Sequence, residues 1–244
     1  MKRAFFLTAY NRPGYLKSTL DSWLTVRGKE RWDFFFRLEP CSKTEEILDL
    51  IKDFQASSPE VRSTIIVNEA KLGVLHHPWV GFEELFREYD FVVRAEDDIL
   101  VSSDVLEYME WGSTTFLDNQ NVLAVTSHNE GPREPQKDAL IFVTESFNPL
   151  IWGTWKDRWI DVIRDTWDHD YSTFNGTPGN EAGWDWNLNT RIIPQRGLTC
   201  CLPLQSRVSH IGIVGTHGCI ENFKQTPSFI ADREPIAYEV WNEE

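Results

Sequence analysis

The residues Glu96, Asp97 and Asp98 give the strongest indication of chemistry in the chain. They follow an apolar, β-branched run at 91–93, which predicts a short buried strand. Three adjacent carboxylates repel one another, and their burial costs free energy unless a cation or hydrogen-bond donors neutralise them. A hard divalent ion such as Mn²⁺ or Mg²⁺ takes oxygen ligands and leaves room for phosphate oxygens. The cluster therefore indicates a metal site, with a solvated acidic turn as the alternative.

The elements that must position this cluster alternate between strand and helix. Apolar runs predict strands at 3–9, 33–38 and 63–68, with helices between them and a further helix at 76–88 before the acidic cluster. This alternation predicts a mostly parallel sheet flanked by helices, of the Rossmann-like α/β class. Ligands bind such sheets at the carboxyl ends of the strands. No glycine-rich phosphate loop follows any of these strands, so a nucleotide would be held in another way.

Polar residues follow three of the predicted strands and should meet at that edge. Tyr10-Asn11-Arg12 follows the first strand, Glu39 the second, and the acidic cluster the fourth. Asn11 is also a candidate N-cap for a helix that has Pro13 in its first turn, and Glu39 is also a candidate turn residue. Both alternatives stay open.

The second half of the chain is less regular and rich in tryptophan. Trp152-Gly153-Thr154-Trp155 is expected to lead into a helix with Thr154 as N-cap, and 165–183 to form a loop. A short helix is expected from Gly183 to about Ile193. Strands are expected at 121–127, 139–144 and 198–202. With no repeat and no linker, one domain over 1–244 is expected.

Composition and charge exclude several classes of protein. Lys and Arg number 24 against 38 Asp and Glu, a net charge of −14, which opposes binding of a polyanion by bulk electrostatics. No window of about 18 apolar residues could span a membrane. The basic and apolar N-terminus is interpreted as the first strand and not as a signal peptide. The four cysteines lack zinc-site spacing and suit reduced thiols, so a cytoplasmic protein is expected.

Taken in order, these motifs resemble the nucleotide-sugar glycosyltransferases of the GT-A fold. The likeness is closest to the branch of the Golgi N-acetylglucosaminyltransferase of complex N-glycans and its bacterial or phage relatives. It covers nearly the whole chain as an order of motifs: Tyr10-Asn11-Arg12-Pro13, Glu96-Asp97-Asp98, Trp152-Gly153-Thr154-Trp155, Trp184-Asp185-Trp186 and 206–217. The chain shows no signal anchor or stem, so the expected setting is a bacterial cell or a phage-infected host.

The resemblance implies a donor site for a UDP-sugar in residues 1–100 and an acceptor side in 101–244. It makes Asp98 the ligand of a divalent metal that bridges the two phosphates, with Glu96 and Asp97 touching metal-bound water, ribose or sugar. The other residues expected along the nucleotide sugar are Thr8, Tyr10, Asn11, Arg12 and Glu39. Arg207 and Lys71 are candidate phosphate contacts. His210 is a candidate further metal ligand or phosphate contact because imidazole suits Mn²⁺, with His217 as the competing choice.

The resemblance also implies a catalytic base. An inverting transferase needs a carboxylate that takes the proton of the acceptor hydroxyl as it attacks, and Asp185 fills that position between two tryptophans. The alternative is that Asp185 only caps the helix that follows it. A metal-dependent, inverting transfer from a UDP-sugar to a hydroxyl on a glycan or small molecule is therefore the expected reaction.

Three other functions compete with this one. A phage-type enzyme could use a hydroxymethylated base in DNA as acceptor, with Arg133, Lys137, Lys156 and Arg158 offsetting the acidic charge. A nucleotidyltransferase would share the sheet and the acidic site, but it would show a glycine-rich basic segment after the first strand. A non-catalytic carbohydrate-binding protein would keep the tryptophans, and its ligand binding would not depend on Asp98.

Overall fold

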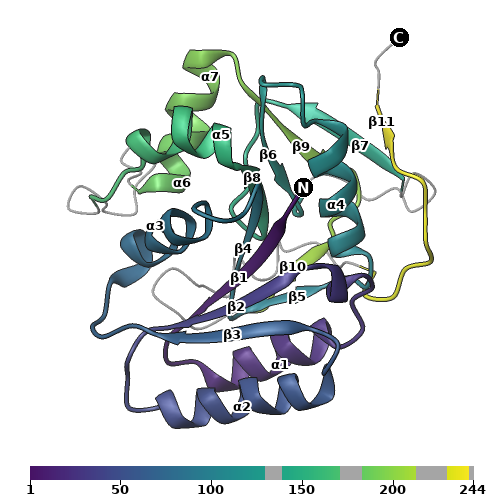
Figure 1. Ribbon diagram of the computed structural model, residues 1–244. Helices are drawn as coiled ribbons and strands as arrows, with labels where there is room; N and C mark the ends of the chain where they lie inside the picture. The colour runs from purple at the N-terminus through teal and green to yellow at the C-terminus, as the bar shows by residue number, and fades with distance from the viewer. Residues whose placement is uncertain (130–138, 171–182, 213–229, 242–244) are drawn as a thin grey trace.

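A computed structural model describes residues 1–129, 139–170, 183–212 and 230–241 (Figure 1). Its first half contains four parallel strands in the spatial order β3-β2-β1-β4. Their bounds are β1 (Arg3–Ala9), β2 (Asp33–Leu38), β3 (Arg62–Val67) and β4 (Phe91–Glu96). The connecting helices are α1 (Pro13–Trp23), α2 (Thr44–Ser57) and α3 (Gly73–Leu85), with a 3₁₀ turn at Lys29–Arg31. This is the predicted alternation.

The second half extends the same sheet beyond β4. β8 (Trp152–Trp155) runs antiparallel to β4 and to β6 (Val122–Thr126). β9 (Thr199–Pro203) is parallel to β6 and antiparallel to β7 (Leu140–Thr144), and β11 (Glu239–Val240) is parallel to β7. The order in the sheet is therefore β11-β7-β9-β6-β8-β4-β1-β2-β3. The predicted α/β class, a mostly parallel sheet flanked by helices, is confirmed.

The remaining helical elements are short except for α4. They are α4 (Val105–Thr115), α5 (Lys156–Arg158), a π-helical turn at Trp159–Ile163, a 3₁₀ turn at Arg164–Thr166, α6 (Trp184–Asn187), a π-helical turn at Leu188–Ile192, and α7 (Ile193–Arg196). None of the helices in the described ranges is long and apolar enough to cross a bilayer.

The period of two along the strands divides the core between the two faces of the sheet. Phe5, Phe34 and Val93 face α1, α2 and α4, whereas Phe6 and Val92 face α3 and the tryptophan-rich second half. Figure 1 shows α1 and α2 together on one side of the sheet and α3 with α5, α6 and α7 on the other. The tryptophans at 152, 159, 167 and 184 are largely core residues of this second face.

A separate two-stranded sheet was not predicted. β5 (Ile99–Val101) pairs antiparallel with β10 (Val208–His210), which puts His210 opposite Ile99. Both strands have only three residues, too few for a periodic pattern to indicate them. This pairing places Val208–His210 directly beside the acidic cluster.

Three local expectations were wrong. Trp152–Trp155 is a strand, and the Thr154 hydroxyl donates to the Leu123 carbonyl at 2.7 Å instead of capping a helix. Asn11 does not cap α1, because the N-cap residue is Arg12 and no side chain donates or accepts there. Helix α3 begins at Gly73, three residues earlier than predicted. The carboxylate of Glu39, which is distant in sequence, accepts a hydrogen bond from the first N–H group of the helix.

Candidate functional site

The acidic cluster meets Arg12 at the carboxyl ends of β1 and β4. Arg12 Nη1 donates to Asp98 Oδ2 at 2.6 Å, and its Nη2 donates to Asp97 Oδ1. The backbone N–H of Tyr10 donates to Asp97 Oδ2 at 3.4 Å. Asp97 and Asp98 are 3% and 2% exposed, so the guanidinium is a neutralising cation for two buried carboxylates. The parallel strands β1 and β4 are neighbours, which is why these segments converge.

His210 joins this group through the pairing of β5 with β10. Its Nε2 lies 3.2 Å from Asp98 Oδ2, and the N–H of Ile211 donates to the Asp98 carbonyl at 2.9 Å. Gly212 is packed against the same two side chains: a Cβ at position 212 would collide with Asp98 Oδ2 and lie 2.8 Å from His210 Nε2. His217 lies outside the described residues.

The two aspartates titrate differently although they are neighbours. Burial raises the pKa of Asp97 to about 6, against the opposing charge of Arg12. Burial would also raise the pKa of Asp98, but the hydrogen bond from His210 and the charge of Arg12 together lower it. The same hydrogen bond raises the pKa of His210, against the effect of burial. Asp98 is therefore the carboxylate that stays ionised most readily.

The donor atoms at Asp98 and His210 suit a divalent cation. Asp98 Oδ1 is buried and has no hydrogen-bond partner within the described part of the chain. A carboxylate oxygen next to an imidazole nitrogen is a donor set that Mn²⁺ accepts. Among the described residues, no three His, Cys, Asp or Glu side chains are grouped so that they could hold a metal alone. Phosphate or water oxygens would therefore have to complete the coordination.

Glu96 and Asp185 are both under the influence of the charge of Arg94. Glu96 Oε1 accepts from Arg94 Nη2 at 2.5 Å. Asp185 is the second residue of α6, and burial raises its pKa, opposed by backbone N–H groups and Arg94 and reinforced by Glu96. Its Oδ1 is buried without a hydrogen-bond partner among the residues described. The structure thus brings Asp185 within electrostatic reach of the acidic cluster, with one oxygen available to accept a proton.

Glu39 caps α3 from the end of β2. Its Oε1 accepts from the N–H groups of Leu72 at 2.9 Å and Gly73 at 2.7 Å, so the carboxylate compensates the positive end of the helix dipole. Lys71 precedes this turn, and its Nζ lies 4.1 Å from the centre of the Tyr10 ring. Capping α3 is a structural role for Glu39. It is more specific than the turn residue that the sequence offered as the alternative to a nucleotide contact.

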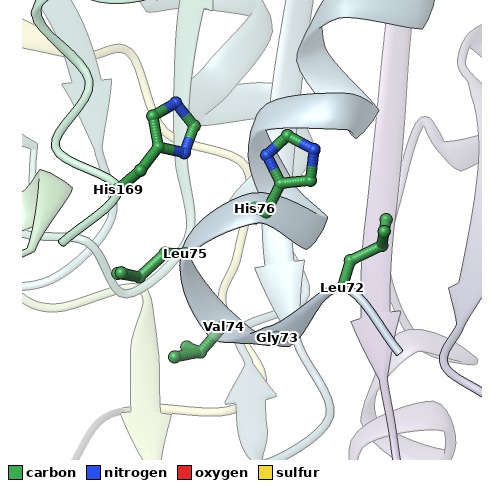
Figure 2. Close-up of a pocket in the computed structure, with 6 residues that line it drawn as sticks. All are labelled: Leu72, Gly73, Val74, Leu75, His76 and His169. Atoms are coloured by element: carbon green, nitrogen blue, oxygen red, sulfur yellow. The ribbon is translucent and has the colours of Figure 1, made fainter. Parts of the chain in front are cut away.

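A pocket of about 460 Å³ lies at the start of α3, where Glu39 accepts from the N–H groups of Leu72 and Gly73. It is lined by the first turn of α3, residues 72–76, and by His169 (Figure 2). Figure 2 shows the ring of His169 beside that of His76, and the ring centres are 5.4 Å apart. Its volume is in the range of small-ligand sites.

Three candidate residues make their contacts away from the acidic cluster or are exposed to solvent. Thr8 lies within the sheet, and its hydroxyl donates to the Ala95 carbonyl at 3.2 Å. Asn11 is exposed just beyond β1. Arg207 is 0% exposed and pairs through Nε with Asp104 Oδ2 at 2.9 Å, in a buried group that includes Arg233 and Tyr238. Arg207 therefore supports the fold in this arrangement, and its contact with phosphate stays a prediction.

Two residues of the site went unnoticed in the sequence. Arg94 is a lone cation in the otherwise apolar start of β4, and a charge inside a buried strand is a signal that could have identified it. Gly212 gave no usable signal, because its importance depends on the packing of β10 against the cluster.

No family model matches the chain. Similar solved structures include a mannosyltransferase of Pyrobaculum calidifontis in complex with GDP-Man and Mn²⁺, with a TM-score of 0.54 and 14% identity over 83% of this chain. S. aureus TarS, residues 1–349, matches with a TM-score of 0.52 and 12% identity over 83%. GalNAc-T7 with UDP, GalNAc and Mn²⁺ matches with a TM-score of 0.60 and 10% identity over 86%.

The chain spans between 43% and 57% of the length of these three structures. At such low identity the likeness establishes the fold, which is that of GT-A-type glycosyltransferases. The specific likeness to the N-acetylglucosaminyltransferase branch stays a prediction.

Proposed function

We propose that the protein is a metal-dependent glycosyltransferase that moves a sugar from a nucleotide sugar to a hydroxyl acceptor with inversion. The observation that carries this proposal is the group formed by Arg12, Asp97, Asp98 and His210 at the carboxyl edge of a GT-A-type sheet. Two of the similar structures are complexes with Mn²⁺ and a nucleotide or nucleotide sugar, which supports the same ligand classes here.

On the donor side, Asp98 and His210 would hold a divalent cation, Mn²⁺ or Mg²⁺. When bound, the cation would supply Lewis-acid stabilisation of the charge that develops on the departing diphosphate. Arg12 contributes a second positive charge at the same place, and Lys71 lies one residue before the turn capped by Glu39. The pocket beside Glu39 would take the base or ribose of a donor that we infer to be a UDP-sugar. We propose residues 1–100 as the donor half, with His210 and His169 contributed by the second half of the chain.

On the acceptor side, Asp185 would act as general base. It accepts the proton of the acceptor hydroxyl as that oxygen bonds to the anomeric carbon, and the bond from this carbon to the diphosphate oxygen breaks. The electron pair of the broken bond leaves with the nucleoside diphosphate. Backbone N–H groups of Asp185 and Trp186 interact with the carboxylate, but its Oδ1 has no hydrogen-bond partner in the described part of the chain, and this oxygen supports the role of base.

The acceptor that the site supports is a hydroxyl of a glycan or small molecule. A DNA acceptor finds no support: Arg158, one of the cations invoked for it, is 2% exposed and pairs with Asp157 at 2.7 Å. Arg133 and Lys137 lie outside the described residues. The net charge of −14 opposes a polyanion throughout.

Thermal unfolding in the presence of nucleotide sugars, with and without Mn²⁺, tests the proposal. A donor at a hundred times its Kd should raise the Tm by about 5–10 °C, and the rise should require Mn²⁺. The shift should disappear in Asp98→Asn and persist in Asp21→Asn, a matched change of an exposed aspartate on α1. Release of nucleoside diphosphate with an acceptor panel then identifies the reaction.

Three results would contradict the proposal. No shift with any nucleotide sugar would reject the donor site. Glycan binding that needs no Mn²⁺ and survives in Asp98→Asn would point to a non-catalytic carbohydrate-binding protein. Nucleoside triphosphate turnover with release of pyrophosphate would instead indicate a nucleotidyltransferase.

A further inference from the structure

Arg94 is a buried cation in surroundings that favour an apolar side chain. It is 2% exposed and lies in β4 between Phe6 of β1 and Trp152 of β8. The face of the sheet on which it lies carries Val92, Phe82 and a group of tryptophans. A charge in such a place costs free energy, and apolar residues of similar volume often replace buried ion pairs without loss of stability. The fold alone therefore does not require an arginine here.

The contacts of Arg94 link the two sides of the candidate site. Its Nη2 donates to Glu96 Oε1 at 2.5 Å on the donor side. Its guanidinium carbon lies 5.2 Å from the centre of the Trp184 ring, on the acceptor side. Trp184 is itself stacked on Trp167, with ring centres 4.4 Å apart and planes at 9°, so its ring is firmly held. The residue next to Trp184 is Asp185.

Charge also couples these residues. The positive charge of Arg94 favours the ionised form of Asp185, and the negative charge of Glu96 disfavours it. Arg94 Nε and Nη1 have no hydrogen-bond partner within the described ranges, and neither does Asp185 Oδ1. Unmade hydrogen bonds on buried charged groups are rare in folded proteins. Within the described ranges Arg37 has one such atom, Nε, whereas Arg94 has two and Asp185 adds a third nearby.

We propose that Arg94 is a positioning residue that fixes the donor-side carboxylate Glu96 and the acceptor-side carboxylate Asp185 relative to each other. The inference rests on the proposed function for the roles of the two carboxylates. Arg94 acts through its ion pair with Glu96, its contact with the Trp184 ring and the electrostatic effect of its positive charge on Asp185. Its charge lowers the pKa of Asp185, together with the backbone N–H groups of Trp186 and Asp185 and against the larger effect of burial.

Arg37 provides a matched control on the same face of the sheet. It is 1% exposed in β2 and pairs with Glu84 Oε2 at 2.5 Å. Among the described residues its side chain pairs with Glu84 and not with Glu96 or Trp184, so it shares the burial and pairing of Arg94 but not its position between the carboxylates.

Kinetics at varied pH separate a positioning role from a structural one. Arg94→Met should lower kcat by about ten-fold or more, and the acid limb of the kcat profile should move to higher pH. Arg94→Lys keeps the charge, so its acid limb should stay near that of the unmodified protein. Arg37→Met should leave the limb in place. An unmoved limb in Arg94→Met, or an equal shift in Arg37→Met, would overturn the proposal.

A second measurement does not need turnover, so it separates failure of this inference from failure of the proposed function. Asp185→Asn should raise the Tm at neutral pH. This increase should be larger, by about 2 °C or more, when the substitution is made in Arg94→Met than when it is made in the unmodified protein. In the Arg37→Met background the gain should equal that in the unmodified protein. Equal gains in all three backgrounds would show that Arg94 and Asp185 are not coupled, whatever the protein catalyses.

Discussion

Gly212 and Asp98 are in such close contact that a side chain at position 212 would occupy the space of the Asp98 carboxylate. The glycine lies two residues after His210, whose Nε2 is 3.2 Å from the same carboxylate oxygen. The chain after β10 therefore closes one side of the acidic cluster. The absence of a side chain at 212 is what permits Asp98 and His210 to meet.

Gly212→Ala should disrupt the candidate metal site with little effect on the fold. The added methyl group must displace the Asp98 carboxylate or the His210 ring, so affinity for Mn²⁺ should fall by about ten-fold or more. Titration of Mn²⁺ by calorimetry measures this. Gly14→Ala is the control, because a Cβ there meets no atom within 4 Å. Unchanged Mn²⁺ affinity in Gly212→Ala would mean that Asp98 and His210 do not hold the metal together.

Arg12→Gln should change metal affinity in the opposite direction. The guanidinium neutralises Asp97 and Asp98, so it opposes a second cation at the same carboxylates. Without nucleotide, Arg12→Gln should bind Mn²⁺ several-fold more tightly, whereas Arg12→Lys should resemble the unmodified protein. Electron paramagnetic resonance of free Mn²⁺ gives the dissociation constants. Weaker Mn²⁺ binding in Arg12→Gln would show that Arg12 organises the site more than it competes for it.

Asp104 should be the most sensitive position of the buried group around Arg207. Its carboxylate accepts from Ser102 at 2.6 Å and from the partly buried Tyr238 at 3.0 Å, and it pairs with the fully buried Arg207. Asp104→Ala removes the carboxylate that pairs with the buried guanidinium of Arg207. This loss should lower the free energy of unfolding by about 3–5 kcal/mol. Urea unfolding measures the change.

The matched control for Asp104 is a salt bridge nearer the surface. Glu107 pairs with Arg27 at 2.7 Å, and both side chains are nearly 30% exposed, at 29% and 28%. Glu107→Gln should cost less than about 1 kcal/mol. If Asp104→Ala cost no more than this, Arg207 would be free to leave the buried group and reach a phosphate, as the sequence predicted.

The sequence predicted the first half of the fold well because its strands are long and apolar and its helices are periodic. β1 to β4 and their order of appearance follow directly from local patterns. Local patterns failed where pairing decides the structure. Trp152–Trp155 is a strand because β4 and β6 flank it, and tertiary pairing overrides the helical expectation for this short segment.

The candidate site likewise has a part that local sequence patterns predict and a part that only tertiary pairing determines. Arg12, Asp97 and Asp98 could be brought together from sequence, because carboxyl ends of parallel strands share one edge. The contact of His210 with Asp98 spans 112 residues and depends on two three-residue strands, so no local pattern encodes it. Arg207, three residues before His210, was expected beside phosphate but is buried, because Asp104 neutralises it inside the fold.

Asp185→Asn should abolish turnover while making the protein more stable at neutral pH. Burial raises the pKa of Asp185, so the folded state favours the protonated carboxyl more than the unfolded state does. The stability that this group contributes is complete below its unfolded pKa, about 3.9, and is lost as pH rises through its folded pKa. Removing the charge should therefore raise the Tm at pH 7 but not at pH values near or below that unfolded value.

The same shift sets the pH dependence of activity. A base must be ionised to accept a proton, so the acid limb of the kcat profile should lie above the ordinary range of an aspartate. Activity should fall as pH is lowered through this raised pKa, and Asp185→Glu should retain a measurable acid limb. Thermal unfolding of Asp185→Asn at both pH values and the rate profile of the unmodified protein check the two effects. A Tm lowered at pH 7 in Asp185→Asn would identify Asp185 as a structural cap and remove it as the base.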